Sequence, residues 1–313
     1  MVTIVLLNYK GWRDTIECMA SLLKQTSKDW RAVIADNGSQ DESLEQLKHW
    51  ITDHKAGQQI RLLPLDTNYG FAKGNNLAIE ASKKEASDYY WILNNDTVVE
   101  PDCLEKMVQY MESHPDVAAL TPSIRLYSQP DHLWNAGGRL VFGGRKYYGA
   151  SQPASLFAGK HTLPITFVTG CALLVRHEMV TNGPLFTERF FFGEEDFDFS
   201  LRMQEERKKM VCLLDAVMYH KVSATSNQVA SYNKLFIHTL NRAINLRQHY
   251  SPFAFWIWKT LYFPYTRLRF LGNMRVVEKK QFMTLLAYEA KHNEGVNKAL
   301  FEKYIHYDFT HAE

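Results

Sequence analysis

The sequence predicts an α/β protein with a mainly parallel central sheet flanked by helices, followed by a helical C-terminal region. Short apolar runs rich in β-branched residues alternate with helix-like segments from the start of the chain, which is the pattern of βαβ units. The chain has 313 residues, of which 46% are apolar and 22% charged, so it is long enough to bury a large core. From residue 232 onward the pattern is mostly helical, and we place the boundary near residue 225.

Each expected element follows from its own pattern of apolar residues, caps and breakers. Strands are expected at 3–7, 31–35, 60–65, 89–93, 117–120 and 210–214. Helices are expected at 14–25, 42–52, 72–84 and 104–113, and in a segment that ends near 206. Between 122 and 164 glycine and proline are frequent and periodicity is weak, which indicates long loops or a hairpin before regular structure returns at 166–175.

Composition excludes several classes of protein. The formal net charge of +2 is the difference between 36 basic and 34 acidic residues, so no global field favours a nucleic-acid partner. The apolar start at 2–7 is too short for a signal peptide and is interpreted as a strand. Four cysteines lie far apart without a CxxC pair, which predicts reduced core thiols and a cytoplasmic protein: Cys18, Cys103, Cys171 and Cys212.

Polar residues follow the second strand directly. Asp36-Asn37-Gly38-Ser39 places a carboxylate and a permissive turn at the carboxyl edge of the sheet, where open α/β sheets bind ligands. A ring N–H of a pyrimidine base is a suitable donor to this carboxylate. The alternative is a turn that merely connects strand to helix.

A second polar segment, Asn68 to Asn76, packs small and amide-bearing residues into the start of a helix. Such an entrance lets the backbone approach a phosphorylated ligand closely. Its spacing matches neither GxGxxG nor GxxxxGK[ST], so the sequence gives no support for a nicotinamide cofactor or for P-loop chemistry.

Two positions suit a divalent cation. Asn94-Asn95-Asp96 ends an apolar strand, and Asp96 is suited to Mg²⁺ or Mn²⁺ with diphosphate oxygens and water in the other positions. His220 follows the apolar stretch 211–217 and is suited to complete that metal shell or to contact diphosphate. The alternatives are an Asx turn at the end of the strand and a structural histidine.

The segment Phe190 to Phe199 sets four carboxylates among five phenylalanines. Burying acids in such surroundings is costly unless they bind a metal, a base or each other's protons, and it should raise some of their pKa values. A carboxylate tuned in this way can accept a proton from an attacking hydroxyl. The alternative is an ordinary acid-rich helix N-terminus, stabilised by the helix dipole.

Taken in order, these segments resemble the family 2 glycosyltransferases and, within them, the rhamnosyltransferase-like subgroup of bacterial polysaccharide assembly. The resemblance covers roughly residues 1–250, and its specificity comes from the order of eight weak motifs. The matching runs are Leu7–Trp12, Asp36–Ser39, Asn68–Asn76, Leu93–Thr97, Trp134–Gly138, Thr169–Ala172, Phe191–Asp198 and Tyr219–Lys221.

The resemblance implies a GT-A fold and an inverting transfer of a sugar from a nucleoside-diphosphate sugar, dTDP-rhamnose or a UDP-hexose, to a hydroxyl of a glycan or lipid-linked acceptor in cell-surface polysaccharide synthesis. It implies that Asp196 is the catalytic base, with Glu195 beside it, and that Asp96 is the remaining acid of a DxD-like metal motif, with His220 as a further metal residue. The expected nucleotide-binding residues are Asn8, Asp36, Asn37, Asn68, Gly70, Phe71, Gly74, Asn75 and Asn95.

Two departures from the family pattern affect this transfer of roles. Asn94 replaces the first acid of the DxD motif, and Leu240-Asn241-Arg242 replaces a common Arg-Asn-Arg. Glycoside hydrolysis also uses paired carboxylates but needs no nucleotide pocket, and a nucleotidyltransferase would need a basic, Gly-rich loop that 8–14 lacks. The remaining alternative is an inactive glycosyltransferase-like scaffold or sugar-nucleotide-binding protein, which retention of the three acids at 36, 96 and 196 disfavours.

We therefore expect a catalytic domain at 1–225 and a helical region at 226–313. The segment 252–265 is dense in aromatic residues, but Lys259 interrupts it and Pro264 is expected to break it, so it falls short of the roughly 20 apolar residues of a spanning helix. Between 251 and 280, six basic residues face one acid, a local formal charge of +5. Two explanations stay open: peripheral contact with an anionic bilayer at the inner face of the cell membrane, or docking on the core or in a homodimer.

Overall fold

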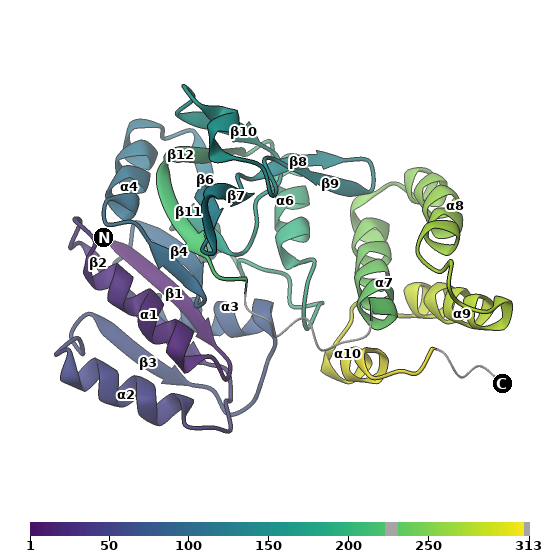
Figure 1. Ribbon diagram of the computed structural model, residues 1–313, viewed down its shortest axis with the longest axis horizontal. Coiled ribbons are helices and arrows are strands. Elements are labelled where there is room, and N and C mark those ends of the chain that lie inside the picture. The colour runs from purple at the N-terminus through teal and green to yellow at the C-terminus, as the bar shows by residue number, and fades with distance from the viewer. Residues whose placement is uncertain (223–230, 310–313) are drawn as a thin grey trace.

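The computed structural model describes residues 1–222 and 231–309, and Figure 1 shows a central sheet with helices on both faces beside a separate group of C-terminal helices. The strand order is β10-β12-β6-β11-β4-β1-β2-β3, with β5 paired to β12 and β7 paired to β6. The strands of this sheet are β1 (Val2–Asn8), β2 (Trp30–Asp36), β3 (Ile60–Pro64), β4 (Tyr89–Asn94), β5 (Thr97–Val99), β6 (Val117–Leu126), β7 (Gln129–Asn135), β10 (Thr162–Ile165), β11 (Ala172–Arg176) and β12 (Lys209–His220).

The predicted parallel core is confirmed in the order β4-β1-β2-β3, where every neighbouring pair is parallel. β6 and β12 are also parallel, whereas β11 runs antiparallel to both β4 and β6. The fold is therefore an α/β sheet whose first half comes from consecutive βαβ units and whose second half mixes strand directions.

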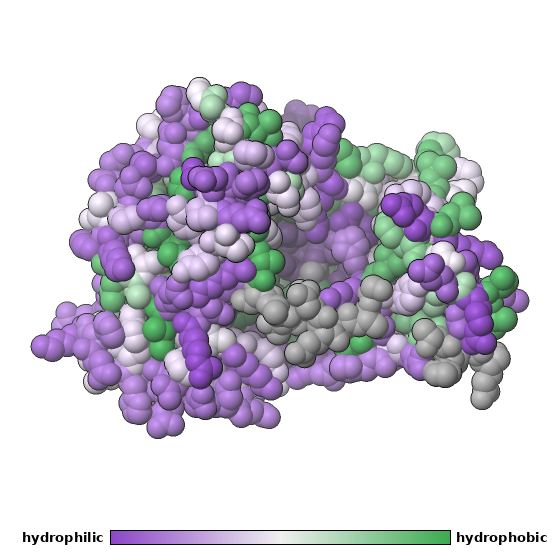
Figure 2. Space-filling model, viewed as in Figure 1, coloured by the Kyte–Doolittle hydropathy of each residue, from purple (hydrophilic) through white to green (hydrophobic). Residues whose placement is uncertain are grey.

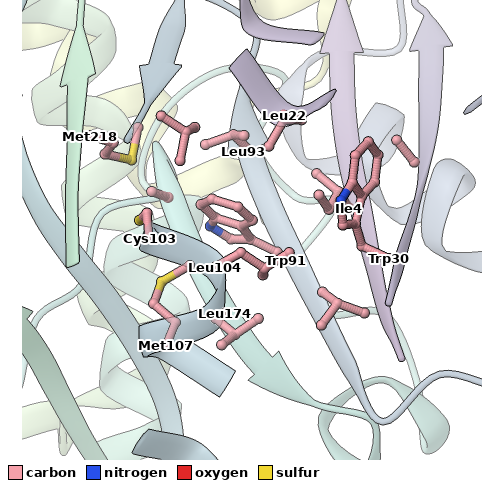
Figure 3. Close-up of a cluster of buried hydrophobic side chains, with 14 of the residues drawn as sticks. Ile4, Leu22, Trp30, Trp91, Leu93, Cys103, Leu104, Met107, Leu174 and Met218 are labelled. Carbon is pink, nitrogen blue, oxygen red and sulfur yellow. The ribbon is translucent and has the colours of Figure 1, made fainter. Parts of the chain in front are cut away.

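Side chains alternate between the two faces along each strand, and helices cover both faces. On one face α1 (Trp12–Leu23), α2 (Ser43–Asp53) and α4 (Cys103–Ser113) pack on residues such as Ile4 and Trp91, as Figure 3 shows for part of this cluster. On the other face α3 (Phe71–Ser82) and α6 (Glu195–Glu205) pack on Val5, Ile92 and their neighbours. All four cysteines are buried and none forms a disulfide.

The region 122–164 holds more regular structure than predicted. The expected hairpin is present as β8 (Gly138–Val141) and β9 (Gly144–Tyr147), followed by a short 3-10 helix, η1 (Ala154–Phe157). β6 and β12 are both longer than predicted, because they pair with each other beyond the apolar runs that mark them in the sequence. β11 begins only at Ala172, so most of the predicted regular segment 166–175 precedes the strand.

The C-terminal region is helical, as expected. It comprises α7 (Ser231–His249), α8 (Pro252–Arg269), α9 (Val276–His292) and α10 (Lys298–Ile305). A third buried cluster joins these helices to Phe167, Phe190 and Phe197 of the α/β part. The expected domain boundary at 225 lies outside the described residues.

The expectation that Pro264 breaks the aromatic segment was wrong, because α8 continues through it to Arg269. Proline at this position removes one backbone donor and need not end a helix that tertiary packing holds in place. Among the residues that the structure describes, no helix is both long enough and apolar enough to cross a membrane.

Candidate active site

The carboxyl ends of β1, β2 and β4 meet at one edge of the sheet. We call it the donor edge, because the resemblance places the expected nucleotide-binding residues there. Asn8 lies opposite Asp36 in the parallel register, and Leu7 lies opposite Asn94. The Asn8 side chain donates a hydrogen bond to Asp36 Oδ1 at 2.7 Å, and the backbone N–H of Ser39 donates to Oδ2 at 3.2 Å. The Asp36 carboxylate is therefore held in a fixed orientation at this edge.

A hydrogen-bonded chain extends this arrangement to the end of β4. Thr15 donates to Asn8 Oδ1 at 2.8 Å, and Asn95 in turn donates to Thr15 Oγ1 at 2.9 Å. The structure thus brings together the predicted residues Asn8, Asp36 and Asn95. Thr15 was not predicted, because a threonine inside a helix carries no signal of this role in the sequence.

The start of α3 lies against the acidic-aromatic segment. Asn68 Oδ1 accepts hydrogen bonds from the Asn37 side chain at 3.0 Å and from the Gly70 backbone at 2.9 Å. Gly70 has φ 80°, and a Cβ there would lie 2.0 Å from the carbonyl oxygen of Phe191. Only glycine fits both the backbone conformation and the close approach. The Phe71 N–H donates to this same carbonyl at 3.2 Å.

Two other predicted residues lie within α3. A Cβ at Gly74 would lie 2.6 Å from Leu7 Cδ1, so this glycine allows α3 to pack closely on β1. Asn75 is buried and its side chain donates to the Phe71 carbonyl at 2.9 Å, while its Oδ1 is buried without a hydrogen-bond partner in the described part of the chain. Contact of Gly74 and Asn75 with a nucleotide stays a prediction.

The two predicted metal residues lie together although 124 positions separate them. β5 pairs with the end of β12, which sets Thr97 opposite His220, and His220 Nε2 lies 3.1 Å from Asp96 Oδ1. Among residues 1–222 and 231–309 no group of three or more His, Cys, Asp or Glu side chains has metal-site geometry. Asp96 and His220 nevertheless provide a carboxylate and an imidazole, two ligand types that Mn²⁺ accepts, so these residues fit the cation if diphosphate and water complete its shell.

Arginines hold two of the four clustered acids ionised. Glu194 accepts hydrogen bonds from Arg242 Nε at 2.6 Å and Nη2 at 2.7 Å. Burial alone would raise its pKa, but Arg242 and the nearby Arg145 lower the pKa of Glu194 to about 2. The pKa of Asp198 is also lowered despite burial, through His249 and two arginines. These two carboxylates are therefore structural anions and are not suited to take up a proton.

The pKa values of the other two acids, Glu195 and Asp196, are raised. Desolvation, together with the charge of Asp196, raises the pKa of Glu195 to about 8, and its Oε2 is buried without a hydrogen-bond partner among the described residues. Burial also raises the pKa of Asp196, and the guanidinium of Arg145, 3.6 Å from its Oδ1, opposes that shift. The environment therefore favours a protonated Glu195 beside an Asp196 that can exchange a proton.

The raised pKa of Glu195 predicts a pH-dependent stability. Because the folded state keeps a proton that the unfolded state releases above its usual pKa near 4.5, stability falls as the pH rises from about 5 towards 8. Glu195→Gln removes this titration. Over this pH range the free energy of unfolding of Glu195→Gln should fall less than that of the wild type. The difference between the two decreases should be about 1 kcal/mol or more. Denaturant unfolding at several pH values measures this, with exposed Glu302→Gln as the control; parallel curves for wild type and Glu195→Gln would contradict the assignment.

A short loop, residues 169–171, lies close to both the donor edge and Asp196. A Cβ at Gly170 would lie 3.2 Å from the Phe71 ring and 3.9 Å from Asp196 Cβ, and the Asn94 N–H donates to the carbonyl of the neighbouring Cys171 at 2.8 Å. The end of β4, the start of α3 and the clustered acids therefore converge around residues 169–171. This convergence makes a single site of segments that the sequence presents separately.

A cavity of about 630 Å³ lies on the other side of Arg145, between the β8–β9 hairpin and helices α7 and α8. Arg145 lines it and also contacts Asp196. Aromatic side chains form much of the wall, and Figure 2 shows the surface hollowed between the α/β part and the C-terminal helices. The lining residues are Phe142, Gly143, Gly144, Arg145, Tyr147, His238, Arg242, Trp258, Leu261, Tyr262 and Tyr265.

The two arginines of this site, Arg145 and Arg242, were not among the predicted site residues. Arg242 belongs to Leu240-Asn241-Arg242, a segment that departs from the family pattern. Arg145 lies in a glycine-rich stretch without periodicity, so neither arginine has a sequence signal that indicates its role. Only the packing of the hairpin and α7 on the clustered acids shows what they do.

The family model "Glycosyl transferase family 2" matches residues 3–181, which is more than half of the chain. The chain belongs to glycosyl transferase family 2. The matched residues include the donor edge and Asp96, while Asp196 and His220 lie beyond them.

Two relatives show how far the similarity extends. Over 254 residues this family 2 glycosyltransferase is 25% identical to the N-acetylglucosaminyl-diphospho-decaprenol L-rhamnosyltransferase of Mycobacterium tuberculosis, covering 74% of this chain and 80% of that protein. Over 124 residues it is 30% identical to the bifunctional glycosyltransferase pgtA of Dictyostelium discoideum, covering 39% of this chain and only 16% of that protein.

Solved structures of similar fold confirm the GT-A architecture of this glycosyltransferase. GalNAc-T7 with UDP, GalNAc and Mn²⁺ superposes with a TM-score of 0.63 at 14% identity, covering 92% of this chain and 54% of that one. Staphylococcus aureus TarS 1–349 gives a TM-score of 0.60 at 15% identity, covering 92% and 79%. The mannosyltransferase PcManGT of Pyrobaculum calidifontis with GDP-Man and Mn²⁺ gives 0.54 at 15% identity, covering 92% and 73%.

Proposed function

We propose that this glycosyltransferase transfers a sugar, with inversion, from a nucleoside-diphosphate sugar to a hydroxyl group in the synthesis of a cell-surface polysaccharide. The observation that carries the proposal is the convergence of the donor edge with Asp196 around residues 169–171. An acid with a raised pKa beside a nucleotide-binding edge is the arrangement that a transferase with a general base requires.

The donor edge is proposed to bind the nucleotide. The fixed carboxylate of Asp36 is suited to accept a hydrogen bond from a pyrimidine base, and Asn8, Asn37 and Asn95 line the same edge. Asn68, Gly70 and Phe71 lie where the donor edge meets the acidic-aromatic segment. dTDP-rhamnose is the first candidate donor because one relative is named an L-rhamnosyltransferase, and UDP-hexoses are the second.

The proposed reaction is a single displacement at the anomeric carbon. Asp196 accepts the proton of the acceptor hydroxyl, whose oxygen forms the new bond to the anomeric carbon from the face opposite the diphosphate. The bond from that carbon to the diphosphate oxygen breaks, and the nucleoside diphosphate leaves with the electron pair. Arg145 contacts Asp196 directly and lowers its pKa against the effect of burial, so the carboxylate is available as a base.

Asp96 and His220 are the residues proposed to hold Mg²⁺ or Mn²⁺, which would supply positive charge to the leaving diphosphate. Two of the similar structures contain Mn²⁺. The acceptor is proposed to be a glycan or a lipid-linked sugar, in keeping with the name of the mycobacterial relative.

Donor turnover tests this function. Purified protein is incubated with dTDP-rhamnose and a panel of UDP-hexoses, and release of free nucleoside diphosphate is measured, since even slow transfer to water distinguishes an enzyme from an inactive scaffold or a sugar-nucleotide-binding protein. We expect release from one of these donors. Binding of a donor without release under all conditions, with and without Mn²⁺, would favour the inactive alternative.

Asp96→Ala is expected to abolish most of the Mn²⁺-dependent part of donor binding. A ligand present at 100 times its dissociation constant stabilises the folded state by about 2.7 kcal/mol, so thermal shift with nucleoside diphosphate, with and without Mn²⁺, measures the loss. Asp53→Ala, an exposed acid of α2, is the control and should behave as wild type. Full wild-type activity in excess chelator would show that no metal is required.

A further inference from the structure

Helix α8 exposes an unusual number of large apolar side chains on one side, which we call the α8 face. Its opposite side packs into the third core cluster through Trp258 and Phe263. Figure 2 shows hydrophobic residues gathered over this helix. The α8 face consists of five side chains that are between 51% and 80% exposed: Phe253, Trp256, Leu261, Tyr265 and Leu268.

Basic residues are frequent in α8 and in the segment that follows it. Residues 251–280 carry six basic residues and one acid, a local formal charge of +5. Arg267 and Arg269 are exposed at the end of the helix, and no carboxylate of the described residues forms an ion pair with them or with Lys259. The one acid, Glu278, is buried and bonded to Arg275. The segment that carries the exposed aromatics therefore has a positive formal charge, with Arg267 and Arg269 exposed beside them.

This charge distinguishes the two explanations of the aromatic segment. A symmetric dimer through the α8 face would place the same patch of each copy against the other, so that two clusters of like charge would face each other at short range. An anionic lipid surface instead offers complementary charge to the cations and an interfacial layer in which tryptophan and tyrosine are favoured. The buried side of α8 already packs on the core, so docking on the core does not cover the exposed α8 face.

The α8 face is continuous with the cavity beside the clustered acids. Leu261 and Tyr265 belong to both, and Trp258 lies on the cavity wall between them and the core. On the opposite wall Arg145 reaches to within 3.6 Å of Asp196 Oδ1. The cavity therefore extends from the exposed apolar face to Arg145, the residue that contacts the proposed base.

We propose that the α8 face docks on the surface of an anionic bilayer, with α8 lying in the plane of the interface, and that the cavity mouth thereby opens toward lipid-linked acceptors. The part concerning the acceptor rests on the proposed function, whereas the docking does not. Basic residues near such a surface contribute about 1 kcal/mol each, and buried apolar side chains add to this. This location corresponds to a peripheral enzyme at the inner face of a cell membrane.

Vesicle flotation of the full-length protein tests the docking. We expect the protein to float with vesicles of phosphatidylcholine and phosphatidylglycerol at low salt. Flotation should be much weaker with phosphatidylcholine alone. It should also be much weaker at about 1 M salt, because a Debye length of about 3 Å screens the charges. The double variant Trp256→Ser/Leu268→Ser should lower the partition coefficient on the order of tenfold or more. The matched control is Leu156→Ser, which removes a similarly exposed side chain, 57% against 60% for Trp256, from η1, and it should float as wild type does.

Brominated lipids locate the contact. They should quench tryptophan fluorescence of the wild type, and Trp256→Phe, which preserves the apolar face, should lose most of that quenching while still floating. Thermal unfolding midpoints of all variants confirm that they are folded.

Several results would overturn the proposal: no flotation at low salt, equal flotation with neutral and anionic vesicles, or equal effects of the Leu156 and Trp256/Leu268 variants. A concentration-dependent dimer that Trp256→Ser/Leu268→Ser dissociates, without vesicle binding, would assign the α8 face to contact between copies. Donor turnover in solution is measured separately, so failure of turnover with intact flotation would count against the proposed function alone, and the reverse result against the docking alone.

Discussion

Asp196→Asn is expected to lower the rate of sugar transfer by about a hundredfold to ten-thousandfold, the usual contribution of a positioned general base. Donor binding should stay within a few fold of wild type, because the base acts on the acceptor hydroxyl and not on the nucleotide. Asparagine has nearly the same shape as aspartate but cannot accept the proton. Calorimetric titration with nucleoside diphosphate and initial transfer rates measure the two effects separately.

The neighbouring acids provide the comparison for this variant. Glu195→Gln should retain far more transfer than Asp196→Asn, because burial and the neighbouring charge of Asp196 raise the pKa of Glu195 and so favour its protonated form, which cannot act as the base. Asp198 is held by Arg189 and Arg202, so its loss should affect stability first. Transfer that persists in Asp196→Asn would move the role of base to one of these two acids.

Arg242→Leu is expected to destabilise the fold by about 3–5 kcal/mol, the usual cost of removing one partner of a buried ion pair. The side chain of Glu194 is only 1% exposed and accepts two hydrogen bonds from Arg242, so the variant leaves its charge poorly compensated. Arg242 also stacks on the Phe197 ring, 3.9 Å from guanidinium carbon to centroid, and this contact is lost as well.

Chemical denaturation measures the cost, and two further variants interpret it. Adding Glu194→Gln to Arg242→Leu removes the uncompensated charge and should recover part of the lost stability. Arg139→Leu replaces an exposed arginine on β8 and should change stability little. A cost below about 1 kcal/mol for Arg242→Leu would show that Arg145 alone compensates Glu194, contrary to our interpretation of the site.

The first half of the fold could be predicted from the sequence because its strands and helices alternate as local units. The runs at 31–35 and 89–93 are mostly apolar and buried, and the run at 60–65, at the end of the strand order, is only partly buried. The structure places strands at all three within a residue or two. The full lengths of β6 and β12 could not be predicted, because their second halves are held by pairing with each other across about ninety positions of chain and not by local propensity.

The same distinction applies to the candidate site. That Asn8 and Asp36 lie together follows from two parallel strands ending at one edge, and the structure confirms their contact. Asp96 and His220 meet only because β5 pairs with the end of β12, a long-range pairing without a local sequence signal. The different environments of Glu194 and Asp196 depend on arginines from a hairpin and from α7. Before the packing was known, only the family resemblance, and not the residues themselves, distinguished Asp196 from the other clustered acids.

The anomeric configuration of the transferred sugar is the most direct test of the proposed single displacement. With a donor that the protein turns over, proton NMR can record the anomer of the product, whether a glycoside or the free sugar released into water, before mutarotation scrambles it. A single displacement assisted by Asp196 predicts that the first product has the configuration opposite to that of the donor, and that Asp196→Asn suppresses its formation. A first product with the donor's own configuration would contradict the single displacement and the role of Asp196 as a base.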